Sequence, residues 1–300
     1  MYKRTKQPYS TPKVTTLTVK ENALLMDFLL AKMGGMSRNA VKSLLKYGQV
    51  AVNSKAISQF DHPLQQGDNV QVSNRRTIVE KDTPQLHILY EDDHIIVIDK
   101  AAGLLTVTTG SGMDTTAFSI LKEHVLRSSP KNKIFTVHRL DQLTSGVLVF
   151  AKTGDVQHAF RDNWRDVVTK RTYIALVEGK VEKEEGKISS WLTENKKTHV
   201  IYSSNTDNGG KPAVTRYKRL QFTEQFSLLE VELETGRKNQ IRVHMKDIGH
   251  PIVGDRKYGS QTLIGRIALH ARVLEFYHPV TGKRMNFETS VPKEFMKLLK

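Results

Sequence analysis

The residues best suited to chemistry lie in one short stretch, His138 to Gly146, which reads HRLDQLTSG. Its small residues predict a turn, and the apolar run 147–150 that follows predicts a buried strand. Asp141 therefore lies on a tight turn at the mouth of a buried strand, close to an arginine. Taken alone, such an aspartate is more often a turn residue paired with a neighbour such as Arg139.

A second candidate region runs from Glu234 to Gly259. A predicted strand ends at Glu234, and Thr235, Gly236 and Arg237 turn the chain into a short helix with one apolar face. Lys238, Arg242 and Lys246 are predicted to share another face. A strand–turn–helix junction that presents arginines suits an anionic ligand, although a solvated surface row fits the same pattern.

Metal and thiol chemistry find little support in the sequence. The chain has no cysteine, which excludes disulfides, thiolate nucleophiles and cysteine-bound zinc. Four histidines near the candidate regions match no zinc spacing, namely His138, His244, His250 and His270. We expect no metal site.

The elements that must position these residues divide the chain. Residues 85–300 contain strand-like runs at 87–90, 94–99, 147–150, 173–177 and 227–234, and helical patterns at 115–125 and 155–164. Tyr173 lies in one of these strands, where core packing is its default role. Strands that outnumber helices without strict alternation predict an α+β domain with a mixed, mostly antiparallel sheet. A polar loop is expected at 203–212.

A smaller α+β domain is predicted at 14–73, after a basic arm at 1–13 and before a linker at 74–84. Ser37 and Gly48 are expected to begin and end its second helix. Arg38, Lys42 and Lys46 recur every four residues and should project from one side of that helix. Such a row of cations is often an ordinary solvated face. RNA binding is the alternative, because the stretch from Met36 to Val72 resembles the small RNA-binding domain of the ribosomal S-four type.

The overall charge favours a polyanionic partner. Lys and Arg number 46 against 31 Asp and Glu in 300 residues, for a net charge of +15. No apolar run approaches the ~20 residues that span a bilayer, and the N-terminus lacks the apolar core of a signal peptide. We expect a cytoplasmic monomer that does not bind membranes.

Three long motifs resemble those of the RluA family of RNA pseudouridine synthases. Residues 138–152 are similar to its His-Arg-Leu-Asp-x-x-Thr-Ser-Gly motif with the Ala-Lys that follows, and residues 170–179 to its Lys-x-Tyr-x-Ala-Leu-Val-x-Gly motif. Residues 235–259 are similar to its Thr-Gly-Arg-x-His-Gln-Ile-Arg motif and the Gly-His-Pro-Ile-x-Gly-Asp segment after it. Asn239 replaces the usual histidine, and Ala101 replaces the usual proline.

The resemblance implies the pseudouridine synthase fold and the isomerisation of specific uridines in RNA, with no cofactor. It assigns Asp141 as the catalytic carboxylate, Arg242 as its ion-pair partner and Tyr173 as the residue that stacks on uracil. Further residues are expected to bind substrate, namely His138, Arg139, Thr144, Arg237, Arg38, Lys42 and Lys46. Ribosomal RNA of the large subunit is favoured as substrate, and transfer RNA is the alternative.

Two other functions remain open from the residues alone. A non-catalytic RNA-binding or ribosome-assembly protein could keep this fold, but it predicts damage to Asp141, Tyr173 or Arg242, and all three are present. A hydrolase could use Asp141 with a histidine, but the sequence shows no signature for its second acid or base.

Overall fold

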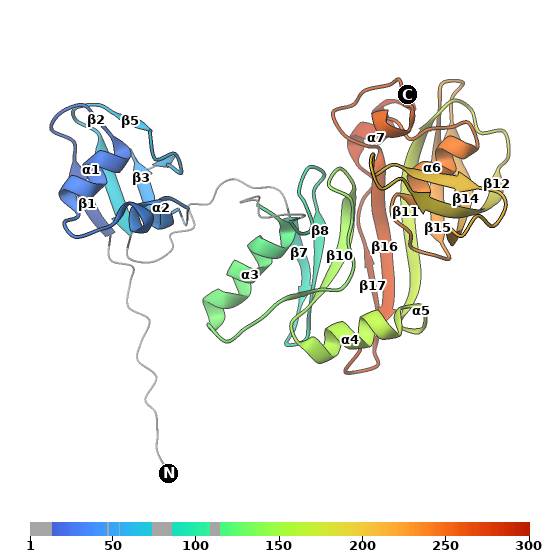
Figure 1. The fold of residues 1–300 in the computed structure, drawn as a ribbon. Helices are drawn as coiled ribbons and strands as arrows, with labels where there is room; N and C mark the ends of the chain where they lie inside the picture. The colour runs from blue at the N-terminus through green and yellow to red at the C-terminus, as the bar shows by residue number, and fades with distance from the viewer. Residues whose placement is uncertain (1–13, 47, 54, 74–85, 109–114) are drawn as a thin grey trace, which may run out of the picture. The chain divides into compact units, whose positions relative to one another are not determined.

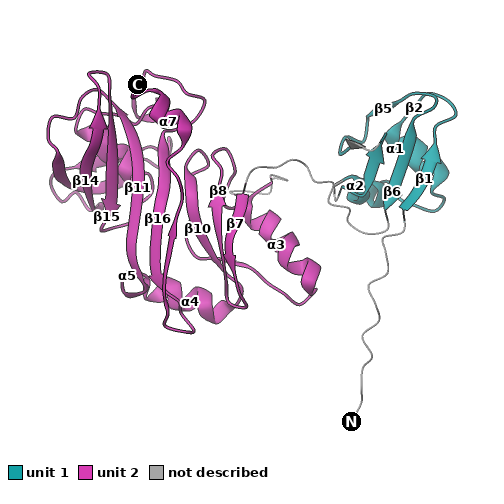
Figure 2. Ribbon diagram, turned by 180° about the vertical axis from the view of Figure 1, so that it is seen from behind, with its two compact units in different colours: residues 1–83 teal, residues 84–300 magenta. Residues whose placement is uncertain are grey.

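The computed structural model describes residues 14–46, 48–53, 55–73, 86–108 and 115–300. The chain forms two compact units, Met1–Thr83 and Pro84–Lys300, which Figure 2 shows in different colours. The arm expected at 1–13 and the linker expected at 74–84 lie outside the described residues.

The N-terminal unit combines two helices with short antiparallel strands. The helices are α1 (Leu25–Lys32) and α2 (Arg38–Lys46). One sheet has the order β1-β6-β3-β4, and β2 pairs with β5. The strands are β1 (Val14–Thr18), β2 (Ala23–Leu24), β3 (Val50–Val52), β4 (Lys55–Ala56), β5 (Pro63–Leu64) and β6 (Asn69–Ser73).

Local signals in the N-terminal unit act as the sequence predicts. The hydroxyl of Ser37 accepts a hydrogen bond from the amide of Ala40 at 3.2 Å, which caps α2. Gly48 has a φ of 63°, the left-handed conformation that ends many helices. The apolar sides of α1 and α2 pack together, with Leu25, Leu29 and Val41 fully buried.

The C-terminal unit is built on one large, mostly antiparallel sheet (Figure 1). Its main path has the order β13-β12-β14-β15-β11-β16-β10-β8-β7, while β17 pairs with β16 and β9 with β10. Among these pairs only β10 and β16 run parallel. This arrangement confirms the predicted α+β class and its mixed sheet.

Most expected elements of this unit are present, with shifted ends. The strands are β7 (Leu86–Glu91), β8 (Ile95–Lys100), β9 (Phe135–Thr136), β10 (Ser145–Ala151), β11 (Val168–Glu178), β12 (Glu185–Glu194), β13 (Ile201–Ser204), β14 (Lys211–Phe222), β15 (Phe226–Leu233), β16 (Leu269–Tyr277) and β17 (Arg284–Glu288). The helices are α3 (Ala117–Ser128), α4 (Gly154–Asp162), α5 (Trp164–Val167), α6 (Gln240–Asp247) and α7 (Lys293–Lys297), with a 3₁₀ turn η1 (Arg256–Tyr258).

Two boundary predictions were wrong. The helix expected at 155–164 is divided at Asn163 into α4 and α5. The loop expected at 203–212 is shorter at both ends, because β13 continues to Ser204 and β14 begins at Lys211. Pairing with neighbouring strands decides both ends, since Leu192 of β12 lies opposite both Ser203 and Lys211.

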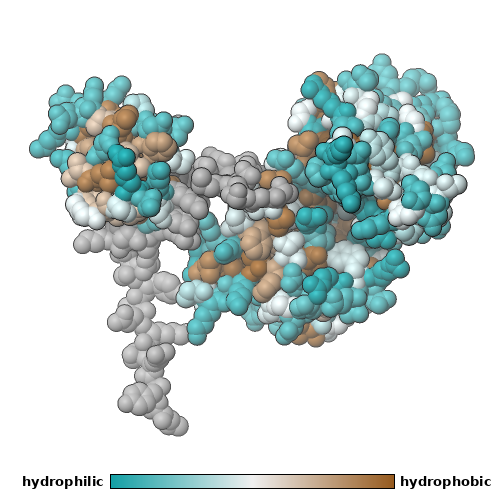
Figure 3. Space-filling view, in the orientation of Figure 1, coloured by the Kyte–Doolittle hydropathy of each residue, from teal (hydrophilic) through white to brown (hydrophobic). Residues whose placement is uncertain are grey.

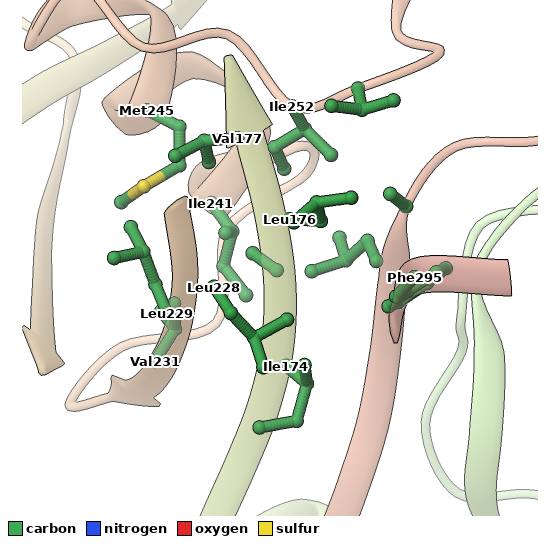
Figure 4. Packing of buried hydrophobic residues seen from close by; sticks show 14 of the residues in the cluster. Ile174, Leu176, Val177, Leu228, Leu229, Val231, Ile241, Met245, Ile252 and Phe295 are labelled. Carbon is green, nitrogen blue, oxygen red and sulfur yellow. The ribbon is translucent and has the colours of Figure 1, made fainter. Parts of the chain in front are cut away.

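The core beside the candidate site joins the centre of the sheet to α6. Side chains from β11, β15 and α6 converge there, and Phe295 of α7 packs into the same cluster (Figure 4). Ile174, Leu229 and Met245 are completely buried in it. The packing holds α6 against the sheet and so fixes the position of Arg242.

On the face that Figure 3 shows, both units carry many hydrophilic residues. Across the described ranges, no helix is long and apolar enough to cross a membrane.

Candidate active site

The turn that carries Asp141 is positioned by close backbone packing. Asp141 precedes β10, and its carbonyl accepts a hydrogen bond from the amide of Thr144 at 3.1 Å. Gly146 has a φ of +113°, and a Cβ there would lie 2.1 Å from the carbonyl oxygen of Ala271. Only glycine therefore permits the approach of β10 to β16 directly after the turn.

Lys100 holds the other side of this turn and was not predicted to belong to the site. Its buried ammonium donates to the carbonyls of Leu104 at 2.8 Å, Ala101 at 3.0 Å and Gln142 at 3.3 Å. Burial lowers the pKa of Lys100 to about 8. The lysine thus joins the segment after β8 to the turn that contains Asp141. Ala101, one of the two departures from the family motif, contributes its backbone carbonyl to this contact.

Asp141 and Arg242 form an ion pair, although 101 positions separate them in the sequence. Arg242 Nη1 donates to Asp141 Oδ2 at 3.0 Å. The side chain of Arg242 is 10% exposed and that of Asp141 is 38% exposed. The ion pair therefore joins a largely buried guanidinium to a carboxylate that remains accessible to solvent. Arg139 has no carboxylate partner among the described residues, and the alternative turn pair between Arg139 and Asp141 is not formed.

Asp255 is the principal site residue that sequence reasoning missed. Its carboxylate binds Arg242 in a bidentate pair, with Nε to Oδ2 at 2.6 Å and Nη2 to Oδ1 at 2.9 Å. The Asp255 side chain is 1% exposed. Its place in the third motif was visible, but nothing in the spacing indicated a partner for Arg242. Together with Asp141 it raises the pKa of Arg242 against the opposing effect of burial.

Asn239 and Tyr258 complete the surroundings of the guanidinium. Asn239 adopts a left-handed conformation with a φ of 55° just before α6. Its Oδ1 accepts from Arg242 Nη1 at 3.2 Å, and its Nδ2 donates to the Tyr258 hydroxyl at 3.1 Å. The Tyr258 ring lies 5.0 Å from the Arg242 Cζ. The asparagine that departs from the family motif therefore orients the nitrogen that faces Asp141.

The predicted shared face of Lys238, Arg242 and Lys246 is wrong. Lys238 precedes α6 and pairs with Glu194 at 2.5 Å, while Lys246 is exposed on the helix. Arg242 and Lys246 lie one turn apart on α6, but Arg242 is buried and Lys246 is exposed, whereas Lys238 precedes the helix and lines a large cleft.

Tyr173 lies on β11 beside the ion pair. It is half-buried and lines both a cleft of about 770 Å³ and a smaller cavity of about 80 Å³ that also borders Asp141 and Arg242. Burial raises the pKa of its hydroxyl, with a smaller contribution from Asp141, so the phenol stays protonated at neutral pH. Its ring is available to stack on a planar group.

The larger cleft is rich in cations. Asp141 and Tyr173 lie in its wall together with the basic residues Arg139, Arg161, Arg165, Arg171, Arg237 and Lys238. Its only other acidic residue among those described, Glu234, pairs with Arg216 at 2.5 Å. An excess of guanidinium groups around one carboxylate fits a polyanionic ligand.

The remaining predicted substrate-binding residues of this unit differ in where their side chains lie and what they contact. Arg139 and Arg237 line the cleft. His138 also lines it, but its Nε2 accepts from the amide of Val149 at 3.2 Å, and burial lowers its pKa to about 3. Thr144 is 2% exposed and borders the small cavity, where its hydroxyl has no hydrogen-bond partner among the described residues.

The basic residues of the N-terminal unit form a separate exposed surface on α2. Arg38 and Lys42 are exposed, whereas the side chain of Lys46 lies outside the described residues. The Lys42 ammonium lies 5.5 Å from the ring centre of Phe60, which is 51% exposed. Sequence reasoning missed Phe60, because only the tertiary structure brings it to α2.

Among the residues that the structure describes, no group of three histidine or acidic side chains could hold a metal ion. His244 and His270, both considered as ligands, are buried in hydrogen-bonded networks with serine and threonine hydroxyls.

Comparison with known proteins identifies the family. A family model described as RNA pseudouridylate synthase matches residues 94–247. A Bacillus subtilis protein named uncharacterized RNA pseudouridine synthase YlyB is 33% identical over 294 residues, which cover 95% of this chain and 96% of that protein. The chain belongs to the RluA family of RNA pseudouridine synthases.

Other members of the RluA family match over similar lengths. Ribosomal large subunit pseudouridine synthase D of Nitrosomonas europaea is 34% identical over 302 residues, which cover 94% of this chain and 86% of that protein. Ribosomal large subunit pseudouridine synthase C of Haemophilus ducreyi is 31% identical, with 87% and 86% covered. The solved structure of human RNA pseudouridylate synthase domain containing 4 shares the fold, with a TM-score of 0.57 and 24% identity, covering 70% of this chain and 90% of that one.

Membership makes this protein an RNA pseudouridine synthase, an isomerase that acts on RNA. The two non-isomerase functions that the residues alone left open are therefore set aside.

Proposed function

We propose that this enzyme isomerises specific uridines of large-subunit ribosomal RNA and that Asp141 is its catalytic carboxylate. One observation carries the assignment: Asp141 accepts a hydrogen bond from a buried arginine that Asp255 already holds in a bidentate pair, at the edge of a cleft lined by arginines. The carboxylate is thus oriented by a fixed donor while its other oxygen, Oδ1, has no partner among the described residues.

The reaction requires the target base to leave its stack. Extrusion of a base costs a few kcal/mol, and contacts with the RNA backbone must offset that cost. The arginines of the cleft supply such contacts, and Arg139, next but one to Asp141, is placed to bind a flanking phosphate or to fill the space that the base leaves.

The uridine would then enter the larger cleft at Asp141 and Tyr173, next to the small cavity that Arg242 also borders. Tyr173 and Thr144 both border it. The protonated Tyr173 ring would stack on uracil, and the unpartnered Thr144 hydroxyl would find a hydrogen-bond partner in the nucleotide.

Asp141 acts at the sugar in this proposal. The bond between uracil N1 and the ribose breaks, the base turns, and C5 is joined to the same ribose carbon with loss of the C5 proton, while N1 takes up a proton. No oxidation and no net hydrolysis occur, so the reaction balances without a cofactor. Arg242 keeps the carboxylate oriented while charge changes at the sugar.

The choice of RNA rests on the relatives and on the N-terminal unit. Two full-length relatives are named ribosomal large subunit pseudouridine synthases. The N-terminal unit, which resembles the S-four type of RNA-binding domain, exposes Arg38 and Lys42 on α2 and would bind ribosomal RNA outside the cleft. A ribosomal substrate would place the enzyme in the cytoplasm.

Release of tritium from RNA labelled at uridine C5 tests the proposal. Wild-type protein should release tritium from unmodified large-subunit ribosomal RNA, and Asp141→Asn should release none while still binding that RNA. Release by Asp141→Asn at the wild-type rate would remove Asp141 from the reaction. Release from transfer RNA alone would change the substrate class.

A further inference from the structure

Arg171 is a half-buried cation in the wall of the cleft, and the ion pair at Asp141 does not use it. It lies on β11 two residues before Tyr173, so the alternation of the strand places both side chains on the same face of the sheet. Burial lowers the pKa of its guanidinium, which means that its position disfavours the charge it carries.

Its contacts do not compensate for this burial. Arg171 Nη2 donates to the carbonyl of Leu233 at 3.3 Å, and its Cζ lies 5.5 Å from the centre of the Trp164 ring. No carboxylate lies within ion-pair distance of it among the described residues. Arg242 and Arg266, whose side chains are 10% and 14% exposed, each pair with a carboxylate. A partly buried guanidinium without a carboxylate partner is suited to accept an anion from a ligand.

The turn after β15 is shaped around this guanidinium. A Cβ at Gly236 would lie 2.8 Å from Arg171 Nη1, so a side chain there would force the arginine to move. The nearby acids are already committed, because Asp141 pairs with Arg242 and Glu234 pairs with Arg216. An anion that pairs with the Arg171 guanidinium must therefore come from a ligand.

We propose that Arg171 binds a phosphodiester group of the RNA strand next to the target uridine. The inference rests on the proposed function, in which a single nucleotide enters the cleft while its neighbours remain outside. A phosphate on either side of that nucleotide is the anion that RNA brings to this wall, and its oxygens suit the forked donors of a guanidinium.

The test compares Arg171→Met with Lys170→Met. Methionine keeps the apolar stem against Trp164 and removes the charge. Lys170 is the matched control, because it is the adjacent cation on the same strand, is exposed on the opposite face and lies 3.8 Å from Glu232. Both proteins are titrated with unmodified large-subunit ribosomal RNA at several salt concentrations, and tritium release gives KM and kcat.

Arg171→Met should bind this RNA at least about tenfold more weakly, because a charge-assisted bond is lost. Its plot of log affinity against log salt should be shallower by about 0.7, the value for one phosphate contact with a single strand. KM should rise more than kcat falls. Lys170→Met should stay within about twofold of wild type, since an exposed pair contributes little.

Thermal unfolding separates this role from a structural one. Removal of an uncompensated charge should leave the melting temperature of Arg171→Met unchanged or higher. A lower melting temperature with wild-type affinity and salt slope would overturn the inference and make Arg171 a structural residue. If wild type binds the RNA but releases no tritium, the proposed function fails, while the affinity difference still decides the contact of Arg171.

Discussion

Two cationic regions of this protein hold their charges in opposite ways. In the C-terminal unit, Arg242 is 10% exposed and bonds to the side chains of Asp255, Asp141 and Asn239. In the N-terminal unit, Arg38 and Lys42 are exposed on α2 and have no carboxylate partner among the described residues. The first region fixes one guanidinium in one geometry, and the second presents exposed charges to solvent.

The difference follows from desolvation. A buried guanidinium interacts strongly with a few groups and must be fully paired, so its position becomes specific. Exposed cations are screened by water and salt, and they act through their number and their field rather than through one contact. Chemistry at a single sugar needs the first arrangement, whereas holding a long polyanion needs only the second.

The largest effect that would sharpen this comparison is expected at Asp255. Asp255→Asn leaves Arg242 without its buried partner and should cost about 3–5 kcal/mol of unfolding free energy, with a loss of turnover of at least about 100-fold. Asp141→Asn should lose turnover completely but change stability by only about 1 kcal/mol, because its side chain is 38% exposed. Urea unfolding measures the stability loss of each variant, and tritium release measures its turnover. Equal stability losses for Asp255→Asn and Asp141→Asn would contradict the difference in burial that we describe.

Charge reversal on α2 should affect binding alone. Arg38, Lys42 and Lys46 changed together to Glu should weaken binding of ribosomal RNA by about 100-fold and flatten its salt dependence. The urea midpoint and kcat at saturating RNA should match wild type. Unchanged affinity and salt slope would show that α2 does not bind RNA, and a loss of kcat would show that it does more than bind.

Acid should destabilise the C-terminal unit through its buried histidines. The Nδ1 of His270 lies 2.7 Å from the Ser145 hydroxyl, which also accepts a hydrogen bond from Arg266. The Nδ1 of His244 lies 2.8 Å from the Thr215 hydroxyl, which accepts a hydrogen bond from Gln240. Burial lowers the pKa of both histidines to about 4, with a smaller contribution from Arg266 at His270 and an opposing one from Asp247 at His244.

The sign follows from the protons bound by each state. Between pH 6.5 and about 4 the unfolded chain binds protons on these histidines that the folded chain does not, so stability falls as pH falls through that range, by about 1–3 kcal/mol for each histidine. Both tryptophans, Trp164 and Trp191, lie in the C-terminal unit, so their fluorescence during urea unfolding at pH 7 and pH 5 reports on it alone. His244→Gln should reduce the difference between the two pH values, and an unreduced difference would contradict this account.

The smallest effect is expected at Asn239. Asn239→Gly keeps the left-handed backbone but removes the amide that bonds to Arg242 and Tyr258. Turnover should fall several-fold, with a stability loss of about 1 kcal/mol. Asn239→Gln is the control, because it keeps an amide group but displaces it from Arg242 and Tyr258. Wild-type turnover in Asn239→Gly would show that Asp255 alone orients the guanidinium.

Much of the fold follows from local signals in the sequence. The alternation of apolar residues in 227–234 predicted β15, and Ser37 and Gly48 marked the ends of α2. The break at Asn163 and the limits of β13 and β14 were not predictable in this way, because packing and pairing with neighbouring strands decide them.

The sequence by itself determined the family, the class of fold and the candidate residues Asp141, Tyr173 and Arg242, because long motifs preserve residue types in order. Only the tertiary structure showed that Asp255 holds Arg242 and that Arg171 has no carboxylate partner among the described residues. The reason is physical. Whether a charge is paired depends on groups that distant segments bring within about 3 Å, and on the water that their packing excludes, and neither is encoded in local spacing.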